Sequence, residues 1–441
     1  MKYAVFWASL SGVPFLAWFL SLKLQWIRWA IFGMIVGIYA YQPTAINFLS
    51  HEWYTGTSRG MEISLIHILA LAVLLALAFR GKWQRLFPEG GIVIYAVYFL
   101  LCLPSLWQAD NILFGWLEIW KMMLLFLFWH AVYGYLAATG DVGTVVKALA
   151  VFTIASFLEV ARQHYAGVFQ PGGVFPHRNC MSMAMNLLGP VFFAGYLQLG
   201  LKDWLGRLCA GAFAGAALGG MWSYSRGAIA MIPVGYGLAA LGCLVHVRPL
   251  GRMALRMAPV ALAGAVGLVA IWPNLVGRFE NASPASKETR KNMAYCTLEM
   301  IKAHPWTGVG INNLSLNMDE THPYRDRASE AQGREVFAEG IVETVYLLVG
   351  AECGIPALLA MLAWFGWYWL ACTKLAWRLR GTKWHFVAAG LCGGLAANYL
   401  QSTLEWVLRQ QMNLFLLVFC FALAAYLRKW KPPPEDRRAP A

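Results

Sequence analysis

Stretches of mostly apolar residues, each close to the ~20 that a helix needs to cross a bilayer, recur along this chain from one end to the other. Within the hydrocarbon core, only helices or closed barrels satisfy their backbone hydrogen bonds. Soluble globular chains are about 45–50% apolar and about 25% charged. This chain of 441 residues is 59% hydrophobic and 13% charged. We therefore predict an all-α, polytopic membrane protein.

We predict twelve or thirteen membrane spans, because the first two apolar runs are hard to separate. The first run is expected to be a retained helix, since no clear small-residue cleavage site follows it. Together the spans form one integral membrane domain, residues 1–427. The predicted spans cover 3–20, 26–42, 62–79, 91–107, 112–136, 143–160, 181–199, 203–220, 226–245, 253–272, 341–371, 384–403 and 409–427.

Lys and Arg residues in the short loops set the predicted orientation. Counting spans places five basic segments on one side, which we take to be cytoplasmic: 80–85, 202–207, 248–256, 374–383 and 428–438. The tail 428–441 is Pro-rich and basic, and we expect it to be disordered. Thirteen spans put the N-terminus outside, whereas twelve put it inside. Because this pattern accounts for the net charge of +13, we exclude a nucleic-acid partner.

The opposite side is predicted to hold segments 43–61 and 161–180, the turn Trp222–Arg226 and the stretch 274–340. The last carries eight basic and nine acidic residues, which suits a large translocated loop. Helical spacing over Ala294–Ala303 predicts a small amphipathic helix near the membrane surface.

Several arginines fall on this outer side. Arg226 begins a predicted span, where a charge is costly unless it is paired or functional. Its planar fork suits bidentate contact with phosphate, although an interfacial Arg can also simply extend its head group towards water. Segment 161–180 contributes Arg162, His164, His177 and Arg178, which predict either an anionic head-group site or an ordinary solvated loop.

Two carboxylates lie where the late span begins. Glu343 and Glu352 are nine residues apart, about 13–14 Å along a helix, so they cannot act as a pair. Each has a raised pKa if it is desolvated, or else pairs with a cation. Either state supports general-base work, and a helix-end carboxylate is the alternative. Glu118 and Lys121 are spaced to pair on one helix face, and Glu159, Glu405 and Arg409 lie in or beside outer half-spans.

Residues 303–313 form a Gly-broken turn, His304-Pro305-Trp306-Thr307-Gly308-Val309-Gly310, ending in two asparagines. Glycines permit close backbone approach, but the phosphate-loop signature GK[ST] is absent, so a structural turn is favoured. Nine cysteines show no CxxC pair and no cluster with His. We expect neither a metal nor another cofactor.

These motifs resemble the superfamily of O-antigen ligases and O-antigen polymerases, bacterial membrane glycosyltransferases. The resemblance covers about 160–375 and rests on the long outer stretch late in the chain and on three motifs. These motifs are Ser225-Arg226-Gly227, His304-Pro305 with Gly308-Val309-Gly310, and Tyr346-Leu347 leading to Ala351-Glu352-Cys353-Gly354. The resemblance implies a GT-C-like membrane fold in the bacterial inner membrane with its active face in the periplasm.

The family's chemistry implies the substrates. A glycan arrives on undecaprenyl diphosphate, and an acceptor hydroxyl, on lipid A-core or another molecule, attacks its anomeric carbon with inversion and without a metal. Fixed arginines stabilise the leaving diphosphate. We expect Arg226, Arg178, Arg162 and Arg290, with His177, to bind this diphosphate. The family's usual basic His falls on Glu343 and the following Asn on Thr344, so we expect Glu343 and Arg226 to be the catalytic residues.

Three alternatives stay open. The chain could polymerise O-antigen or exopolysaccharide, or ligate a glycan to protein, because these reactions differ only in the acceptor. From another class, it could be a lipid or solute transporter, which favours midplane ionisable residues and paired halves. A non-catalytic scaffold is the third alternative, strengthened only by the missing His.

Overall fold

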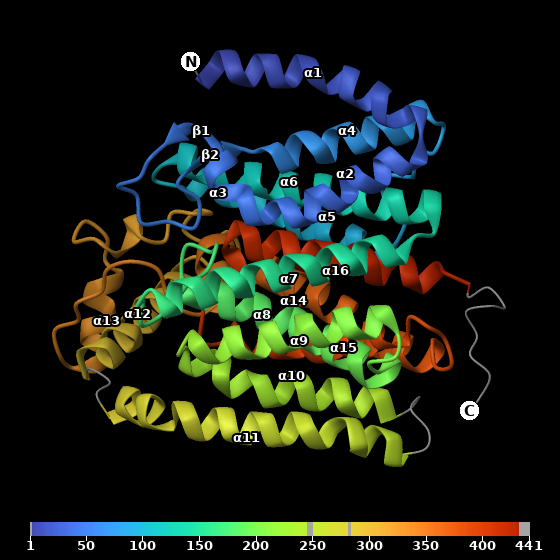
Figure 1. Ribbon diagram of the computed structural model, residues 1–441. Helices are drawn as coiled ribbons and strands as arrows, with labels where there is room; N and C mark the ends of the chain where they lie inside the picture. The colour runs from blue at the N-terminus through green and yellow to red at the C-terminus, as the bar shows by residue number, and fades with distance from the viewer. Residues whose placement is uncertain (1, 245–249, 281–283, 432–441) are drawn as a thin grey trace.

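The computed structural model describes residues 2–244, 250–280 and 284–431 (Figure 1). Helices dominate these residues, as predicted, and only two short strands occur. The helices are α1 Lys2–Leu22, α2 Leu24–Val36, α3 Tyr41–Thr44, α4 Leu65–Phe79, α5 Gly90–Cys102, α6 Ile112–Thr139, α7 Val142–Tyr165, α8 Arg178–Leu199, α9 Trp204–Trp222, α10 Arg226–Leu244, α11 Leu250–Glu280, α12 Pro284–Ala303, α13 Tyr324–Gln332, α14 Val345–Arg378, α15 His385–Gln401 and α16 Gln411–Lys429. Strands β1 Ile46–Ser50 and β2 Gly60–Ile63 form one antiparallel hairpin.

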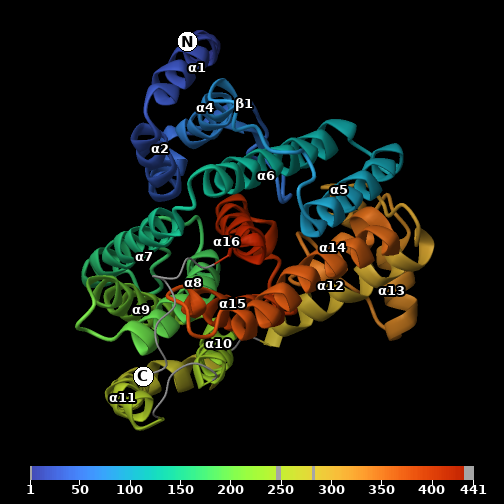
Figure 2. The same ribbon diagram turned by 90° about the vertical axis from the view of Figure 1, so that its right-hand side faces the viewer.

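The long helices lie side by side in a bundle, with loops at both ends (Figure 1). Each of the predicted spans overlaps a helix, and Lys23 separates α1 from α2. Within the described ranges, eight helices are long and apolar enough to cross a membrane. Figure 2 shows α16 in the middle of the bundle, and nearly all of its side chains are buried. The prediction of an all-α polytopic membrane protein is confirmed.

The basic loops gather at one end of the bundle. Arg80 Nη1 donates to the Ser21 carbonyl at 2.5 Å, and Arg428 Nη1 lies 3.2 Å from Glu89. Lys2, at the start of α1, instead bonds the Phe48 carbonyl at the hairpin end of the bundle (3.2 Å). Figure 1 shows the start of α1 and the end of α16 at opposite ends of the bundle. This arrangement fits the odd count of thirteen spans.

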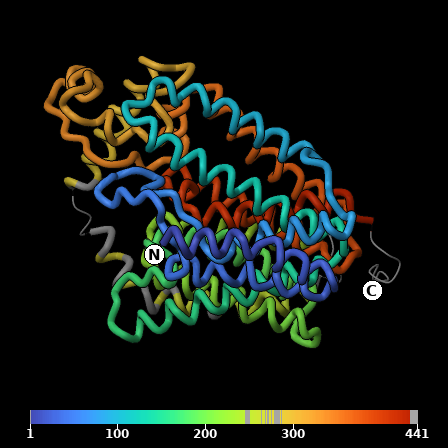
Figure 3. The backbone as a smooth tube through the Cα atoms, turned by 90° about the horizontal axis from the view of Figure 1, so that it is seen from above, coloured from blue at the N-terminus to red at the C-terminus, as the bar shows by residue number. Residues whose placement is uncertain are grey.

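The opposite end differs from the prediction in two ways. Helices α11, α12 and α13 occupy much of 274–340, so this stretch is not a loop from residue 274, and Figure 3 shows α12 and α13 gathered at this end. The helix predicted over Ala294–Ala303 is the second half of α12, which starts at Pro284 because Pro suits a first helical turn. The hairpin within 43–61 was not predicted. The disorder predicted for the tail concerns mostly residues 432–441, which lie outside the described residues.

Helix α14 is interrupted at Gly354, whose φ of 83° is accessible to glycine. The interruption leaves the carbonyls of Ala351 and Glu352 without helical partners. The backbone N–H groups of Val309 and Gly310 donate to these two carbonyls, at 2.8 and 3.1 Å. Segment 303–313 is therefore a structural turn that seals the break in α14, as its sequence favoured.

Candidate active site

Two helix starts bring arginines to the hairpin end of the bundle. Arg178 is the first residue of α8, where His177 acts as N-cap and its Nδ1 accepts from the Asn179 amide at 3.2 Å. Arg226 is the first residue of α10, directly after the tight turn at Tyr224, whose φ is 49°. Each arginine thus stands at a helix N-terminus, where the helix dipole favours an anion.

Arg290 on α12 joins this group through Glu343, which lies just before α14. Their side chains form an ion pair with an N–O distance of 2.7 Å and remain 46% and 34% exposed. Segment 343–345 is fixed against the loop after α15, because the amide of Val345 donates to the Ser402 carbonyl at 3.2 Å. The Glu343 carboxylate is therefore held in place while solvent and substrate can still reach it.

A second carboxylate, Glu405, lies in the loop between α15 and α16. Asn179 Nδ2 donates to both of its oxygens at 2.8 Å, which ties this loop to the start of α8. Gly227 places the start of α10 beside the same loop, since a Cβ there would lie 3.6 Å from Leu404. Five segments distant in sequence thus meet at one place.

Electrostatics couple these groups. Burial raises the pKa of the Glu343 carboxyl, while the positive charges of Arg290 and Arg226 oppose that rise. Burial, together with the negative charge of Glu343, raises the pKa of Glu405 to about 7, and Arg290 and Arg178 oppose it. Three arginines therefore act electrostatically on two carboxylates, and the pKa of one of these, Glu405, is raised to about 7.

The structure leaves Arg162 outside these contacts. Its exposed guanidinium pairs with Glu159, one turn earlier on α7, at 2.6 Å. His164 stacks on Trp222 with ring centroids 4.5 Å apart. His177 caps α8 and lines a polar cavity beside the hairpin, and burial followed by the charge of Arg178 lowers its pKa.

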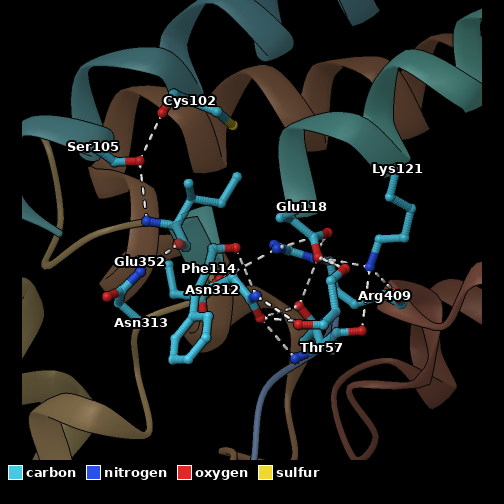
Figure 4. Close-up of polar contacts among 12 residues, drawn as sticks. Thr57, Cys102, Ser105, Phe114, Glu118, Lys121, Asn312, Asn313, Glu352 and Arg409 are labelled. Carbon is cyan, nitrogen blue, oxygen red and sulfur yellow. Dashed lines mark hydrogen bonds and ion pairs between the residues drawn. The ribbon is translucent and has the colours of Figure 1, made fainter. Parts of the chain in front are cut away.

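A second charged group is buried deeper, between α6, α14 and the segment before α16 (Figure 4). Lys121 lies 2.7 Å from Glu118, and Arg409 lies 2.9 Å from Glu118 and 3.3 Å from Glu352. Thr57 donates a further hydrogen bond to Glu118 at 2.8 Å. Two positive charges thus meet two negative charges, so we call this group the buried ion cluster.

Asn312 links the buried ion cluster to segments at the hairpin end of the bundle. Its Oδ1 accepts from the Thr57 amide at 2.8 Å, and its Nδ2 donates to the carbonyls of Ser58 and Phe114 at 2.9 Å each. A φ of 56° places the side chain between these partners, a conformation that Asn tolerates better than most residues. Asn312 therefore fastens segment 303–313 to both the hairpin loop and α6.

Comparison with known families bears on this end of the molecule. A model described as O-Antigen ligase matches residues 211–362. Over these residues the chain is similar to the O-antigen ligase family. The matched O-antigen ligase region contains Arg226, Arg290 and Glu343, whereas Arg178 and Glu405 lie outside it.

A second model, described as Gammaherpesvirus latent membrane protein (LMP2) protein, matches residues 47–170. That description agrees with the apolar helices in this region but adds no chemistry. Comparison with curated proteins gives no match.

Sequence reasoning missed the role of two residues here. Glu405 was noted only as lying in or beside a predicted outer half-span, and Asn179, which directly follows Arg178, was given no role of its own. The available signal was a carboxylate in a short loop between two helices and an amide two residues after the N-cap His177. Neither signal says that the two side chains meet, because they are separated by 226 residues.

Proposed function

We propose that this chain transfers a glycan from undecaprenyl diphosphate to a hydroxyl of an acceptor, lipid A-core or a similar glycolipid, at the periplasmic face of the inner membrane. One observation carries the proposal. Arg290 of α12 pairs with Glu343, and the positive charges of Arg226 and Arg178, at the starts of α10 and α8, act on Glu343 and Glu405 respectively, at the end of the bundle away from the basic loops.

The arginines suit the leaving group. When the bond between the anomeric carbon and the diphosphate oxygen breaks, the lipid diphosphate departs with the bonding electrons. Fixed positive charge at that point stabilises the transition state without reorganisation. Arg178, Arg226 and Arg290 supply one more positive charge than Glu343 and Glu405 can neutralise, and two helix N-termini add partial charge. Arg162 is a more distant candidate for the same anion.

The carboxylates suit the acceptor. The acceptor oxygen forms a bond to the anomeric carbon while its proton passes to Glu343. Attack opposite the leaving group inverts the anomeric centre. Partial burial makes Glu343 a stronger base than an exposed carboxylate, since its neutral form is favoured. No metal and no nucleotide sugar takes part in this proposed step.

Glu343 stands where the family's His is expected, and Thr344 stands at the family's Asn. The Thr344 hydroxyl donates to the Ser402 carbonyl at 3.3 Å and so helps hold this segment. A carboxylate can accept the acceptor proton in place of an imidazole. Glu405 is the second candidate for this proton, because its pKa of about 7 is better matched to neutral pH.

The same structure favours a transporter less than it favours glycan transfer. An interrupted helix and buried charges are features of transporters. Here the break in α14 is closed by backbone hydrogen bonds from Val309 and Gly310, and the charges of the buried ion cluster pair with one another. Ligation and polymerisation differ only in the acceptor, so the test must identify the acceptor.

Deletion of the gene tests the function directly. Cells lacking the protein should accumulate the undecaprenyl-diphosphate-linked glycan and leave one acceptor unglycosylated, as measured by mass spectrometry of membrane lipids. Re-expression of the wild-type chain should restore transfer, while the Arg226→Ala chain at equal abundance should not. Unchanged lipid-linked glycan in the deletion strain would exclude a ligase or polymerase.

A further inference from the structure

A groove between α14 and α16 lies at the end of the bundle that carries the basic loops, away from the candidate active site. Its volume is about 330 Å³, within the range of about 300–1,000 Å³ typical of ligand sites. Arg428 of α16 lines it together with one face of α14, where residues recur at three- and four-residue intervals. The α14 residues include Trp367, Leu370, Ala371, Lys374 and Arg378. We call this space the basic groove.

The basic groove changes in character along α14. Trp367, Leu370 and Ala371 give its first part an apolar wall. Lys374 and Arg378 line the remainder and follow residue 371, where the predicted span ends. The distance along the helix from Trp367 to Arg378 is about 16 Å at 1.5 Å per residue. The groove therefore combines an apolar part inside the predicted span with a basic part beyond its end.

The basic groove has an excess of positive charge. All three of its charged side chains, Lys374, Arg378 and Arg428, are cationic, and no Asp or Glu of the described residues lines it. Glu89, buried at the start of α5, offsets one cation, since its carboxylate lies 3.2 Å from Arg428 Nη1. The partial negative charges at the ends of α14 and α16 offset about one more. About one positive charge remains, which favours an anion.

The three cations are arranged in two different ways. Arg378 is fixed because it donates to the carbonyls of Leu427 and Arg428 at the end of α16. The Arg428 guanidinium is fixed above the Trp367 ring, 4.7 Å from its centre. Lys374 is exposed and makes no hydrogen bond or ion pair with any residue that the structure describes. Two positioned guanidinium groups and one available ammonium group match the oxygens of a phosphate group.

An exposed apolar stripe continues from the basic groove along α14. Ile355, Leu359, Leu362 and Leu370 share one face of the helix and are each 41–59% exposed. The stripe is about 22 Å long at 1.5 Å per residue, which exceeds half of the ~30 Å hydrocarbon core. Such a stripe by itself indicates only a surface that faces lipid. Because Leu370 belongs to both, an acyl chain can lie on the stripe while its head group occupies the basic groove.

We propose that the basic groove binds an anionic phospholipid of the membrane, such as phosphatidylglycerol. Its phosphate contacts Lys374 and Arg428, and one acyl chain lies along the exposed stripe of α14. Basic pockets between membrane helices, on the side of the positive loops, suit anionic head groups. A zwitterionic phospholipid carries an amine that the three cations repel. The bound lipid joins α14 to α16 at the end of the bundle opposite to the proposed glycan transfer.

Native mass spectrometry of the purified full-length protein tests this proposal. The probes are phosphatidylglycerol, phosphatidylcholine with the same acyl chains, and glycerol phosphate, which carries the charge without the chains. Wild-type protein should bind phosphatidylglycerol at least about fivefold more tightly than either of the others. Lys374→Gln should weaken phosphatidylglycerol binding about fivefold, as expected for one basic side chain near a membrane surface. Lys374→Arg should retain the binding, because it keeps the positive charge.

Lys202→Gln is the matched control, because Lys202 is exposed, lies in another predicted cytoplasmic segment and does not line the basic groove. It should bind all three probes as the wild type does. An equal loss in Lys202→Gln and Lys374→Gln would show general attraction to surface charge and overturn the proposal. Equal binding of the two phospholipids by the wild type would overturn it too.

Two further measurements separate this site from other phosphate sites. Tight binding of glycerol phosphate would make the basic groove an anion site without a lipid, and stronger binding of undecaprenyl phosphate would make it a site for the glycan carrier. Either result overturns the assignment to a phospholipid. Arg226→Ala should bind phosphatidylglycerol normally whether or not it transfers glycan. Failure of the proposed function and failure of this inference are therefore distinguishable.

Discussion

The candidate active site and the buried ion cluster use the same residue types in opposite ways. At the candidate active site, Arg290 and Glu343 form an ion pair that is partly exposed, and three arginines stand against two carboxylates. In the buried ion cluster, Arg409 and Lys121 are balanced by two carboxylates and are almost fully buried. Balanced, enclosed charge holds segments together, whereas accessible charge in excess can act on a substrate. Location therefore decides what an Arg–Glu pair does.

The largest expected effect is at Arg226. Arg226→Ala should reduce transfer by about a thousandfold, the upper range for removing one stabiliser of developing charge. Arg226→Lys should restore only part of the activity, because a point charge lacks the guanidinium fork. Transfer by purified protein measures this, and Arg327→Ala, an exposed arginine on α13, is the control. Full activity of Arg226→Ala at normal abundance removes Arg226 from the mechanism.

Arg409→Ala should act on folding rather than chemistry. Removing one partner from a buried charged group leaves the others unpaired and costs about 3–5 kcal/mol. Here two carboxylates, Glu118 and Glu352, lose their shared partner. The yield of monodisperse protein and its thermal midpoint should both fall. A variant that folds normally but no longer transfers glycan would show that the buried ion cluster is functional. The buried ion cluster and the candidate active site would then not differ in role as we infer.

Glu343→Gln should reduce turnover by about a hundredfold with folding intact, as expected for loss of a positioned base. The amide keeps the shape of the side chain but cannot accept the proton. The kcat of purified protein at saturating substrates is the measurement, and its thermal midpoint is the control for folding. Near-normal turnover would transfer the role of base to Glu405 or another group.

The pH dependence tests the coupling of the two carboxylates. Because the base must be ionised, transfer should rise with pH as the pair loses its proton, in a range that includes the pKa of Glu405 at about 7. Glu405→Gln removes a negative charge near Glu343. The protonation step of the pair near pH 7 is then lost, so the rising limb should move to lower pH. A profile of kcat against pH that is unchanged, or shifted upwards, argues against the pair.

The smallest effect is expected at Arg162. Its guanidinium is exposed and pairs with Glu159 on its own helix, so Arg162→Ala should change transfer by no more than about twofold. The same transfer assay measures it beside Arg226→Ala. A large loss would mean that the diphosphate reaches the end of α7 and that the candidate active site includes Arg162.

The sequence by itself determined the membrane fold. The apolar runs located the helices, because the length that spans a bilayer is a local property of the chain. The basic loops, such as 80–85 and 374–383, identified one end of the bundle for the same reason. Segment 303–313 was also interpreted correctly as a turn, since its glycines limit the backbone locally.

The sequence predicted the pair of Glu118 and Lys121 within one helix, but only the tertiary structure decided which charges from distant segments meet. Glu405 and Asn179 form hydrogen bonds across 226 residues, and Arg409 reaches Glu118 across 291. These contacts depend on the orientation of each helix about its own axis and on its position along its neighbours. The sequence of an apolar span contains little information about either. The hairpin was missed because its strands have only five and four residues, and its stability depends on α1 and α6 beside it. Sequence therefore set which segments lie at each end, and packing set which of their side chains form a site.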